Sequence, residues 1–403
     1  MNARLLNMLR STLAFLVIAS ALGLILRFAF VFELPEAIKY KNIQHAHSHG
    51  AMMGWLTACF YLFIWKIFEL RSSVYGKLFW ISQLLVLLML VSFSWTGYSA
   101  ISISLSVLFV FLNYIFVLYV LRDLSRSDGK TFSYSYRFLK AAVFFLAFST
   151  IGIWAMGPII AMSLKGSAWY YGAVQFYLHF QFNGWFIFGL LALLFRLLEK
   201  KNIELDAKML RKFFILLLAS CFPTYALSVS WSTPLSGIFW TNSIGVLLQG
   251  IGLVYFLLMI FKISDKARNQ FRKSVFYLWG ISFFCLSFKI LIQTLVAIPV
   301  LAKVSYTIRY FIIGFIHLLM LGALSTFFFG MMRFFDLKVS RIGIQSFIIG
   351  LFLTESILFL QGLLIWMRLG FIPHYHLILA LCSIPLLLGT VLILWRLKAL
   401  DPA

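Results

Sequence analysis

Seven histidines are the residues of this sequence with the greatest capacity for chemistry. A neutral imidazole is a good ligand for heme iron, copper and zinc, whereas hard cations prefer oxygen ligands. Carboxylates are scarce around the histidines, since Glu355 is the one acidic residue within an apolar segment, so a carboxylate-rich metal site is not expected. The histidines are His45, His47, His49, His179, His317, His374 and His376.

Two of the histidines begin the same short motif. The segments His49–Trp55 and His179–Trp185 both read His-x4-Gly-Trp, and Gly322 follows His317 at the same spacing. The three histidines are 130 and 138 residues apart, about a third of the chain each. Small residues also recur in membrane helices simply because they allow close packing. That alternative accounts for the glycines but not for the shared histidine.

The three motif histidines are also expected to lie at one depth. Each precedes the first basic residue at the end of its hydrophobic segment by 16 or 17 residues, which places all three near the same face of a membrane. The other four histidines fall at that same face. Ionisable groups at membrane depth are costly and usually mark a functional site.

Spacing suggests how the histidines divide into sites. On a helix, His45 and His49 share a face while His47 points elsewhere, so this cluster could serve two sites. His374 and His376 follow a proline at the start of a hydrophobic segment. They are either metal ligands or polar residues at the membrane interface, and the sequence does not choose between these roles.

Other polar residues within apolar segments have two interpretations each. His179 is either a metal ligand or a buried, hydrogen-bonded histidine. Arg27 is at the right height to pair with an anionic heme propionate. Lys289 and Glu355 could form a polar relay or a buried ion pair, and snorkelling or mutual neutralisation is the alternative for them.

The elements that must position these residues are transmembrane helices. The sequence is 63% hydrophobic and 11% charged, with a mean hydropathy of +0.98, far from the composition of soluble domains. Apolar segments of about 20 residues recur without the alternation of a β-barrel. We therefore predict an all-α membrane protein of about twelve transmembrane helices. They are expected near 11–32, 49–68, 78–95, 99–121, 138–160, 173–196, 212–231, 238–261, 274–297, 310–332, 343–366 and 375–396.

The basic residues predict how the chain is oriented. A formal charge of +22 could suggest a nucleic-acid ligand, but 26 of the 34 Lys and Arg residues fall in the two terminal segments and in the loops after even-numbered helices. Only six fall in the odd-numbered loops. The positive-inside rule then places both termini in the cytoplasm. We expect a multi-pass protein of the inner (plasma) membrane whose partner is the lipid bilayer and not nucleic acid.

The organisation predicted along the chain is one polytopic membrane domain, residues 1–403. The repeated histidine motif divides it into three four-helix pseudo-repeats at about 1–125, 126–265 and 266–403. The boundaries between them are expected in two basic loops, 122–137 and 262–273.

This pattern resembles subunit I of the heme-copper oxidases, in which twelve helices form three pseudo-repeats of four. The resemblance implies that the second and tenth helices supply the ligands of a heme b, here His49 or His47 together with His317. Of the two second-helix histidines, we predict His49 as the partner of His317, with His47 as its substitute. The resemblance further implies a copper ligand on the sixth helix, here His179. The chain is also similar to NnrS-type heme- and copper-binding membrane proteins, whose second helix likewise opens with a His-x-His segment.

The departures from the oxidase pattern are as informative as the resemblance. The tyrosine that family carries four residues after the sixth-helix histidine is Asn183 here, the segment 212–231 has no histidine, and the tenth helix has only His317. A standard copper-tyrosine centre for oxygen reduction cannot be built from these residues. The resemblance then implies a heme protein with a redox or O2/NO-related role, an oxidoreductase if it is an enzyme.

Partners and alternatives remain open from the sequence. The resemblance implies a c-type cytochrome or another respiratory subunit as a partner. The main alternative is a protein that transports or assembles copper or heme through an outer-face capture site. The clustered outer-face histidines would then be that capture site. In either case, the candidate metal ligands besides the heme residues are His45, His179, His374 and His376. A structural subunit with a decayed metal site is a third interpretation.

Overall fold

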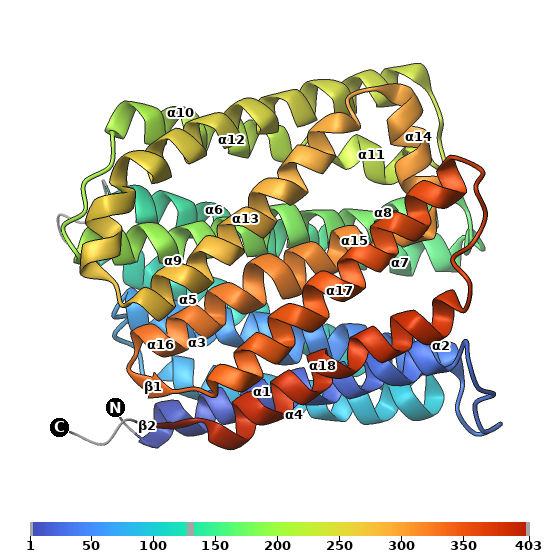
Figure 1. Cartoon of the computed structure of the whole chain (residues 1–403), viewed down its shortest axis with the longest axis horizontal. Coiled ribbons are helices and arrows are strands. Elements are labelled where there is room, and N and C mark those ends of the chain that lie inside the picture. Colours follow the sequence, from blue (N-terminus) through green and yellow to red (C-terminus); the bar gives the residue numbers. More distant parts are fainter. Residues whose placement is uncertain (1–2, 127–132, 400–403) are drawn as a thin grey trace. The chain divides into compact units, whose positions relative to one another are not determined.

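The predicted all-α membrane architecture is confirmed. The computed structural model describes residues 3–126 and 133–399, and within them twelve helices are long and apolar enough to cross a membrane (Figure 1). The chain is therefore a multi-pass membrane protein. In chain order the spans are α1 (Ala3–Phe28), α2–η1–α3 (Tyr40–His49, Gly50–Thr57, Ala58–Ile67), α4 (Val74–Thr96), α5 (Ala100–Ser125), α6–α7 (Tyr134–Ser149, Ile151–Ala161), α8–η2–α9 (Ala168–His179, Phe180–Phe186, Ile187–Lys200), α10–α11 (Ala207–Cys221, Tyr225–Ser230), α12 (Ser236–Gln270), α13 (Lys273–Leu295), α15–η3–α16 (Arg309–His317, Leu318–Ser325, Thr326–Phe334), α17 (Arg341–Trp366) and α18 (Tyr375–Arg396).

Two predicted boundaries differ most from the structure. The second span begins at Tyr40, nine residues before the predicted start, so His45, His47 and His49 all lie within the helix. The segment 262–273, predicted as a loop, is helical as far as Gln270. Both errors have one cause: hydropathy reports where a helix is apolar, whereas polar residues without Gly or Pro continue a helix beyond the apolar stretch. Part of the other predicted boundary, residues 127–132, lies outside the described residues.

The described residues form two compact units. The first comprises those within Met1–Phe116, Tyr277–Trp279 and Ile316–Ala403, and the second those within Val117–Phe276 and Gly280–Phe315. Each unit is described by itself below. The division into three repeats remains a prediction.

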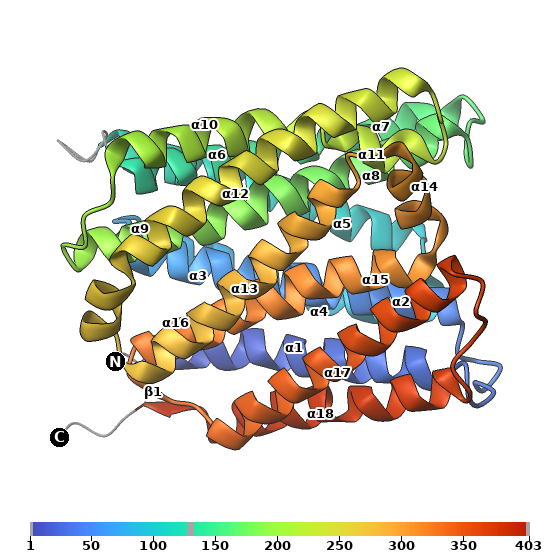
Figure 2. The same cartoon turned by 45° about the horizontal axis from the view of Figure 1, so that its top comes forward.

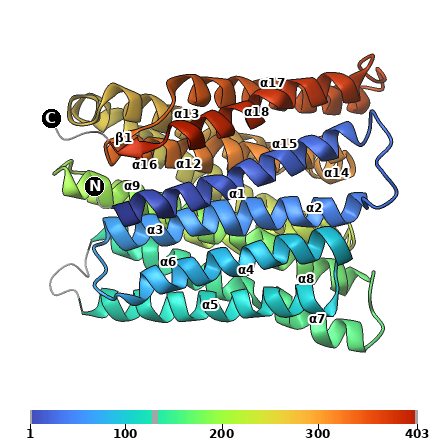
Figure 3. The ribbon, with the colours of Figure 1, turned by 90° about the horizontal axis from the view of Figure 1, so that it is seen from below.

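In the first unit α1 packs beside the second span, as the view from below shows (Figure 3). Helices α17 and α18 form an antiparallel hairpin, which the short strands β1 (Leu337–Lys338) and β2 (Lys398–Ala399) extend by pairing with each other. The Nη2 of Arg10 in α1 donates to the carbonyl of Leu397 at 3.1 Å. The start of the first span and the end of the last therefore lie together, as an even number of membrane crossings requires.

In the second unit, α10 and α12 run side by side, as do α6 and α9 (Figure 2). The core between α6, α9 and α10 is largely aromatic. Phe138 is fully buried and its ring lies 4.8 to 5.8 Å from four others, a spacing typical of favourable aromatic pairs. These rings belong to Phe188, Phe195, Phe213 and Phe214. The short helix α14 (Pro299–Thr307) joins α13 to α15.

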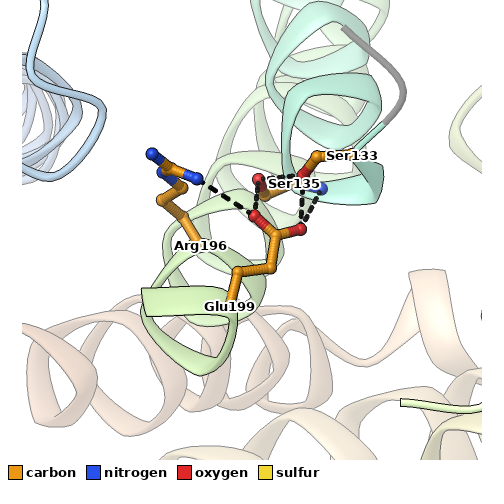
Figure 4. A network of polar contacts seen from close by, with 4 residues as sticks. All are labelled: Ser133, Ser135, Arg196 and Glu199. Carbon is orange, nitrogen blue, oxygen red and sulfur yellow. Dashed lines mark hydrogen bonds and ion pairs between the residues drawn. The ribbon is translucent and has the colours of Figure 1, made fainter. Parts of the chain in front are cut away.

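A charged network holds the start of α6 against the end of α9 (Figure 4). The carboxylate of Glu199 accepts hydrogen bonds from both serine hydroxyls at the start of α6, Ser133 and Ser135, the latter at 2.7 Å. It also accepts from the backbone N–H of Ser135 at 3.3 Å and from Nη1 of Arg196 at 3.3 Å. An anion suits this position because the first N–H groups of a helix have no partner within the helix.

We expect Glu199→Gln to lower the free energy of unfolding by about 2 kcal/mol, because an amide has one acceptor oxygen and no charge for these donors. Thermal unfolding in detergent measures the change. Glu204→Gln in the exposed loop that follows α9 is the control and should leave the melting temperature unchanged. Equal effects of the two variants would show that the network adds no stability.

The predicted orientation is tested by labelling introduced cysteines in intact cells. Glu204→Cys, in the loop after α9, should be protected from a membrane-impermeant maleimide, because the positive-inside rule places that loop in the cytoplasm. Lys165→Cys, in the exposed turn between α7 and α8, should react. The unaltered chain gives the background. Reaction at Glu204→Cys with protection at Lys165→Cys would reverse the predicted topology.

Candidate functional site

Each motif histidine is followed at once by a π-helical segment. Segment η1 begins directly after His49, η2 directly after His179 and η3 directly after His317, and the three are 8, 7 and 8 residues long. π-Helix is rare, and where it interrupts an α-helix it is frequently found at a functional site. The sequence motif therefore has one local structure at all three positions, which supports the predicted repeat.

The surroundings of the first two π segments also match. A Cβ added at Gly54 would overlap the ring of Phe15 in α1, and one added at Gly184 would overlap the ring of Phe145 in α6. The 130-residue interval that separates the two glycines also separates the two phenylalanines. The motif glycine is thus required because an aromatic ring of the preceding span packs directly on the helix backbone.

The second and tenth spans meet inside the first unit. Trp55 Nε1 of η1 donates to the hydroxyl of Ser325 in η3 at 2.9 Å. His47 lies eight residues before Trp55, and His317 lies eight residues before Ser325. Both spans run in the same direction from the face that carries the histidines, so this contact sets His47 and His317 at matched height.

His47 points toward α1 and the tenth span. Its Nδ1 lies 2.7 Å from the carbonyl oxygen of Ala19 and, since a carbonyl only accepts, Nδ1 carries the proton. Its ring contacts the Cα face of Gly23, where a Cβ would come within 2.9 Å of the imidazole carbon Cε1. The imidazole also interacts electrostatically with His317 and Arg27. His47 is therefore the second-span histidine that faces His317.

His317 is accompanied by a buried carboxylate. Its Nδ1 lies 3.6 Å from Oε1 of Glu355 in α17. The side chain of Glu355 is 7% exposed and that of His317 24%. Arg27, at the end of α1, interacts electrostatically with both residues and with Tyr375. Four spans thus contribute to one polar cluster, defined here as His47, His317, Glu355 and Arg27.

His45 and His49 lie on the opposite face of the second span, as their spacing predicted. The His49 ring is 4.3 Å from that of Phe93 in α4, and the His45 ring is 4.5 Å from that of Tyr98. Nδ1 of His49 donates to the carbonyl of His45 at 2.8 Å. Of the two second-span candidates for a partner of His317, the structure therefore favours His47 over His49.

His374 and His376 flank Tyr375 at the start of α18. His374 is exposed and adopts a left-handed conformation, with φ of 54°, just before α18. The His376 ring stacks on Phe30 with 4.9 Å between centroids. These positions fit the interfacial role better than the ligand role considered for them.

His179 belongs to a different network, in the second unit. Its Nε2 donates to the carbonyl of Cys221 at 2.8 Å, and its Nδ1 lies 3.3 Å from Nδ2 of Asn183. Asn183 Oδ1 in turn accepts from the amine of Lys289 at 2.5 Å, and a second bond runs from this amine to Gln293 Oε1 at 2.7 Å. Lysine only donates and a carbonyl only accepts, so the direction of every bond along this chain is determined.

Both ring nitrogens of His179 are consequently occupied by protein partners. The structure thus matches the second of the two roles considered for this residue, a buried, hydrogen-bonded histidine, and the copper role implied by the resemblance loses support. Lys289, which is fully buried, and Glu355 each have partners within their own unit. Asn183, which replaces the expected tyrosine, bridges Lys289 and His179.

The partners of the two ring nitrogens therefore distinguish two kinds of histidine. In His47, His49 and His317 the Nδ1 atom faces an oxygen, and Nε2 has no hydrogen-bond partner among the described residues. A ligating histidine has this arrangement, because the oxygen that holds Nδ1–H orients the ring and leaves Nε2 for the metal. His179 does not have it.

Within residues 3–126 and 133–399, no group of three or more His, Cys, Asp or Glu side chains is arranged to hold a metal ion. A six-coordinate heme needs only two protein ligands. No family model matches the sequence, and no curated protein matches it either.

The Lys289 network makes a testable prediction about coupling. Asn183→Leu should lower the free energy of unfolding by about 3 kcal/mol, because it leaves a buried amine without one of its acceptors. Lys289→Met should lower the free energy of unfolding by about 1 to 3 kcal/mol, because it leaves the amide oxygens of Asn183 and Gln293 without their donor. The double variant should lose less free energy of unfolding than the two single variants lose together, by about 1 kcal/mol or more.

Melting temperatures in lipid nanodiscs measure this coupling. Lys289→Met combined with Glu199→Gln is the control, because Glu199 belongs to a separate network and the two effects should add. Additive effects of Asn183→Leu and Lys289→Met would contradict the network.

Proposed function

We propose that this chain is a heme-binding membrane protein that holds a b-type heme through His47 of the second span and His317 of the tenth. The observation that carries the proposal is the pairing of these imidazoles: they lie at matched height on spans that are in contact, and each has Nδ1 facing an oxygen while Nε2 is left for a ligand. The resemblance to subunit I of the heme-copper oxidases assigns heme ligands to the same two spans.

The other members of the polar cluster suit the same group. Arg27 brings a guanidinium to the outer half of the first span, where it would pair with an anionic propionate. Arg27 already interacts electrostatically with Glu355 and with His317, which lie on two other spans. Its guanidinium is the group of this cluster that would offer a propionate compensating charge rather than bare hydrocarbon.

The two ligands also indicate the kind of chemistry. A heme held by both His47 and His317 would supply one-electron transfer rather than binding of O2 or NO. We therefore infer a redox role of electron transfer, with a c-type cytochrome or another respiratory subunit as the partner. The absence of histidine from 212–231 and the use of Asn183 within a closed network argue against a copper-tyrosine centre.

The alternative of a copper or heme transport protein lacks a specific structural feature in its favour. His45 and His49 face aromatic rings, His374 is exposed, and His376 stacks on Phe30. These positions do not converge on one capture site in the part of the chain that is described. The experiment below nevertheless distinguishes the two functions.

Replacing single histidines should distinguish the heme ligands from histidines that do not bind the heme. In purified protein, His317→Ala and His47→Ala should each abolish the low-spin heme spectrum, because each removes one of the two axial nitrogens. His49→Ala, two residues away on the same helix, is the matched control and should keep the spectrum, as should His179→Ala. Absorption spectra and pyridine hemochrome content measure the outcome, together with copper analysis.

Three results would contradict the assignment. Loss of heme in His49→Ala with retention in His47→Ala would move the site to the other face of the second span. Loss in His179→Ala with retention in His317→Ala would move it to the second unit. Protein that is colourless but contains copper would favour the transport alternative.

A further inference from the structure

Glu355 is the most unusual buried group in the described part of the chain. Its side chain is 7% exposed in the middle of α17, and neither carboxylate oxygen has a hydrogen-bond partner among the described residues. The carboxylate of Glu199, by contrast, is surrounded by four donor groups. A carboxylate left without hydrogen bonds in the interior of a membrane protein costs several kcal/mol, so its position calls for a function.

The surroundings of Glu355 show what that function is. Its nearest charge partner is Nδ1 of His317, at 3.6 Å from Oε1, which is the nitrogen that would carry the proton if Nε2 binds a metal. Arg27 interacts electrostatically with the same carboxylate. At 3.6 Å the contact with His317 is one of charge rather than a hydrogen bond.

The two proposed ligands therefore differ in what lies behind them. His47 donates its Nδ1 proton to a neutral backbone carbonyl at 2.7 Å, whereas His317 faces a carboxylate. A carboxylate behind a ligating imidazole fixes its orientation and makes the metal-binding nitrogen more basic. A more basic ligand and a nearby negative charge both favour the ferric over the ferrous state.

We propose that Glu355 is a positioning residue that orients His317 and lowers the reduction potential of the heme. This inference rests on the proposed heme site, and it names the residue that regulates that site. Ala19 on the His47 side has no comparable influence, because its carbonyl carries no net charge.

The test is a spectroelectrochemical titration of the purified, heme-loaded protein. Glu355→Gln keeps the size of the side chain but removes its charge, and it should reduce the preference for ferric heme by about tenfold, as large as the smaller effects that residues behind metal ligands have on metal affinity or activity. For a one-electron couple that change raises the midpoint potential by about 59 mV. Glu355→Asp, which keeps the charge, should restore most of the original potential.

Thr354→Val is the matched control. Thr354 is the neighbouring buried residue of α17, and its hydroxyl bonds only to carbonyls of its own helix, Gly350 and Leu351. The potential of this variant should equal that of the original chain. A structural disturbance of α17 would shift Thr354→Val and Glu355→Gln together.

The remaining outcomes distinguish a failure of the role of Glu355 from a failure of the heme site. Heme bound by Glu355→Gln with an unchanged potential would overturn the role of Glu355 and leave the heme site standing. Heme lost from folded Glu355→Gln but kept by Glu355→Asp would support the role of Glu355, because aspartate keeps the carboxylate charge that glutamine lacks. Absence of heme from the unaltered protein and from every variant would overturn both the heme site and this inference.

Discussion

In lipid surroundings, a polar group of a spanning helix is costly unless it has a partner within the protein, and the imidazoles of this chain meet that constraint in two ways. A histidine has two nitrogens, so the partner of one decides the use of the other. At His179 both are occupied, by Cys221 and Asn183. At His47 and His317 only Nδ1 faces an oxygen. The proposed division between a structural and a ligating histidine follows from this difference.

The π segments suggest how the fold reaches that arrangement. A π-helical turn contains more residues than an α-helical turn, so it rotates the side chains that follow relative to those before. In η1 and η3 the hydroxyls of Thr57 and Ser325 accommodate the altered backbone, because each donates to the carbonyl five residues earlier. The Ser325 hydroxyl also accepts from Trp55. The contact that aligns His47 with His317 thus depends on the π segments themselves.

Most of the architecture could be predicted from the sequence because membrane burial is a local property. All twelve spans appear in the runs of apolar residues, and the opposite faces of His47 and His49 follow from helical periodicity. The errors arise where local hydropathy does not report whether a helix continues. Polar residues extend the helix as far as Tyr40 at one end of the second span and to Gln270 at the end of α12.

The site was less accessible to prediction because it depends on contacts between distant segments. The sequence motif favoured His49 over His47 as the partner of His317, whereas the Trp55–Ser325 contact and the carbonyl of Ala19 favour His47. The copper role of His179 followed from a resemblance, whereas its actual partners come from α10 and, through Asn183, from α13. One signal was present in the sequence: Asn183 stands where the oxidase pattern has a tyrosine, and an amide can bridge two polar groups because it both donates and accepts.

The central claim is that two imidazoles of the first unit hold a heme, and the absorption spectrum of the purified, unaltered protein with its pyridine hemochrome tests it most directly. The account predicts about one b-type heme per chain, with the sharp α and β bands of a low-spin, six-coordinate centre on reduction. A colourless protein, or a high-spin spectrum with an open axial position, would contradict it.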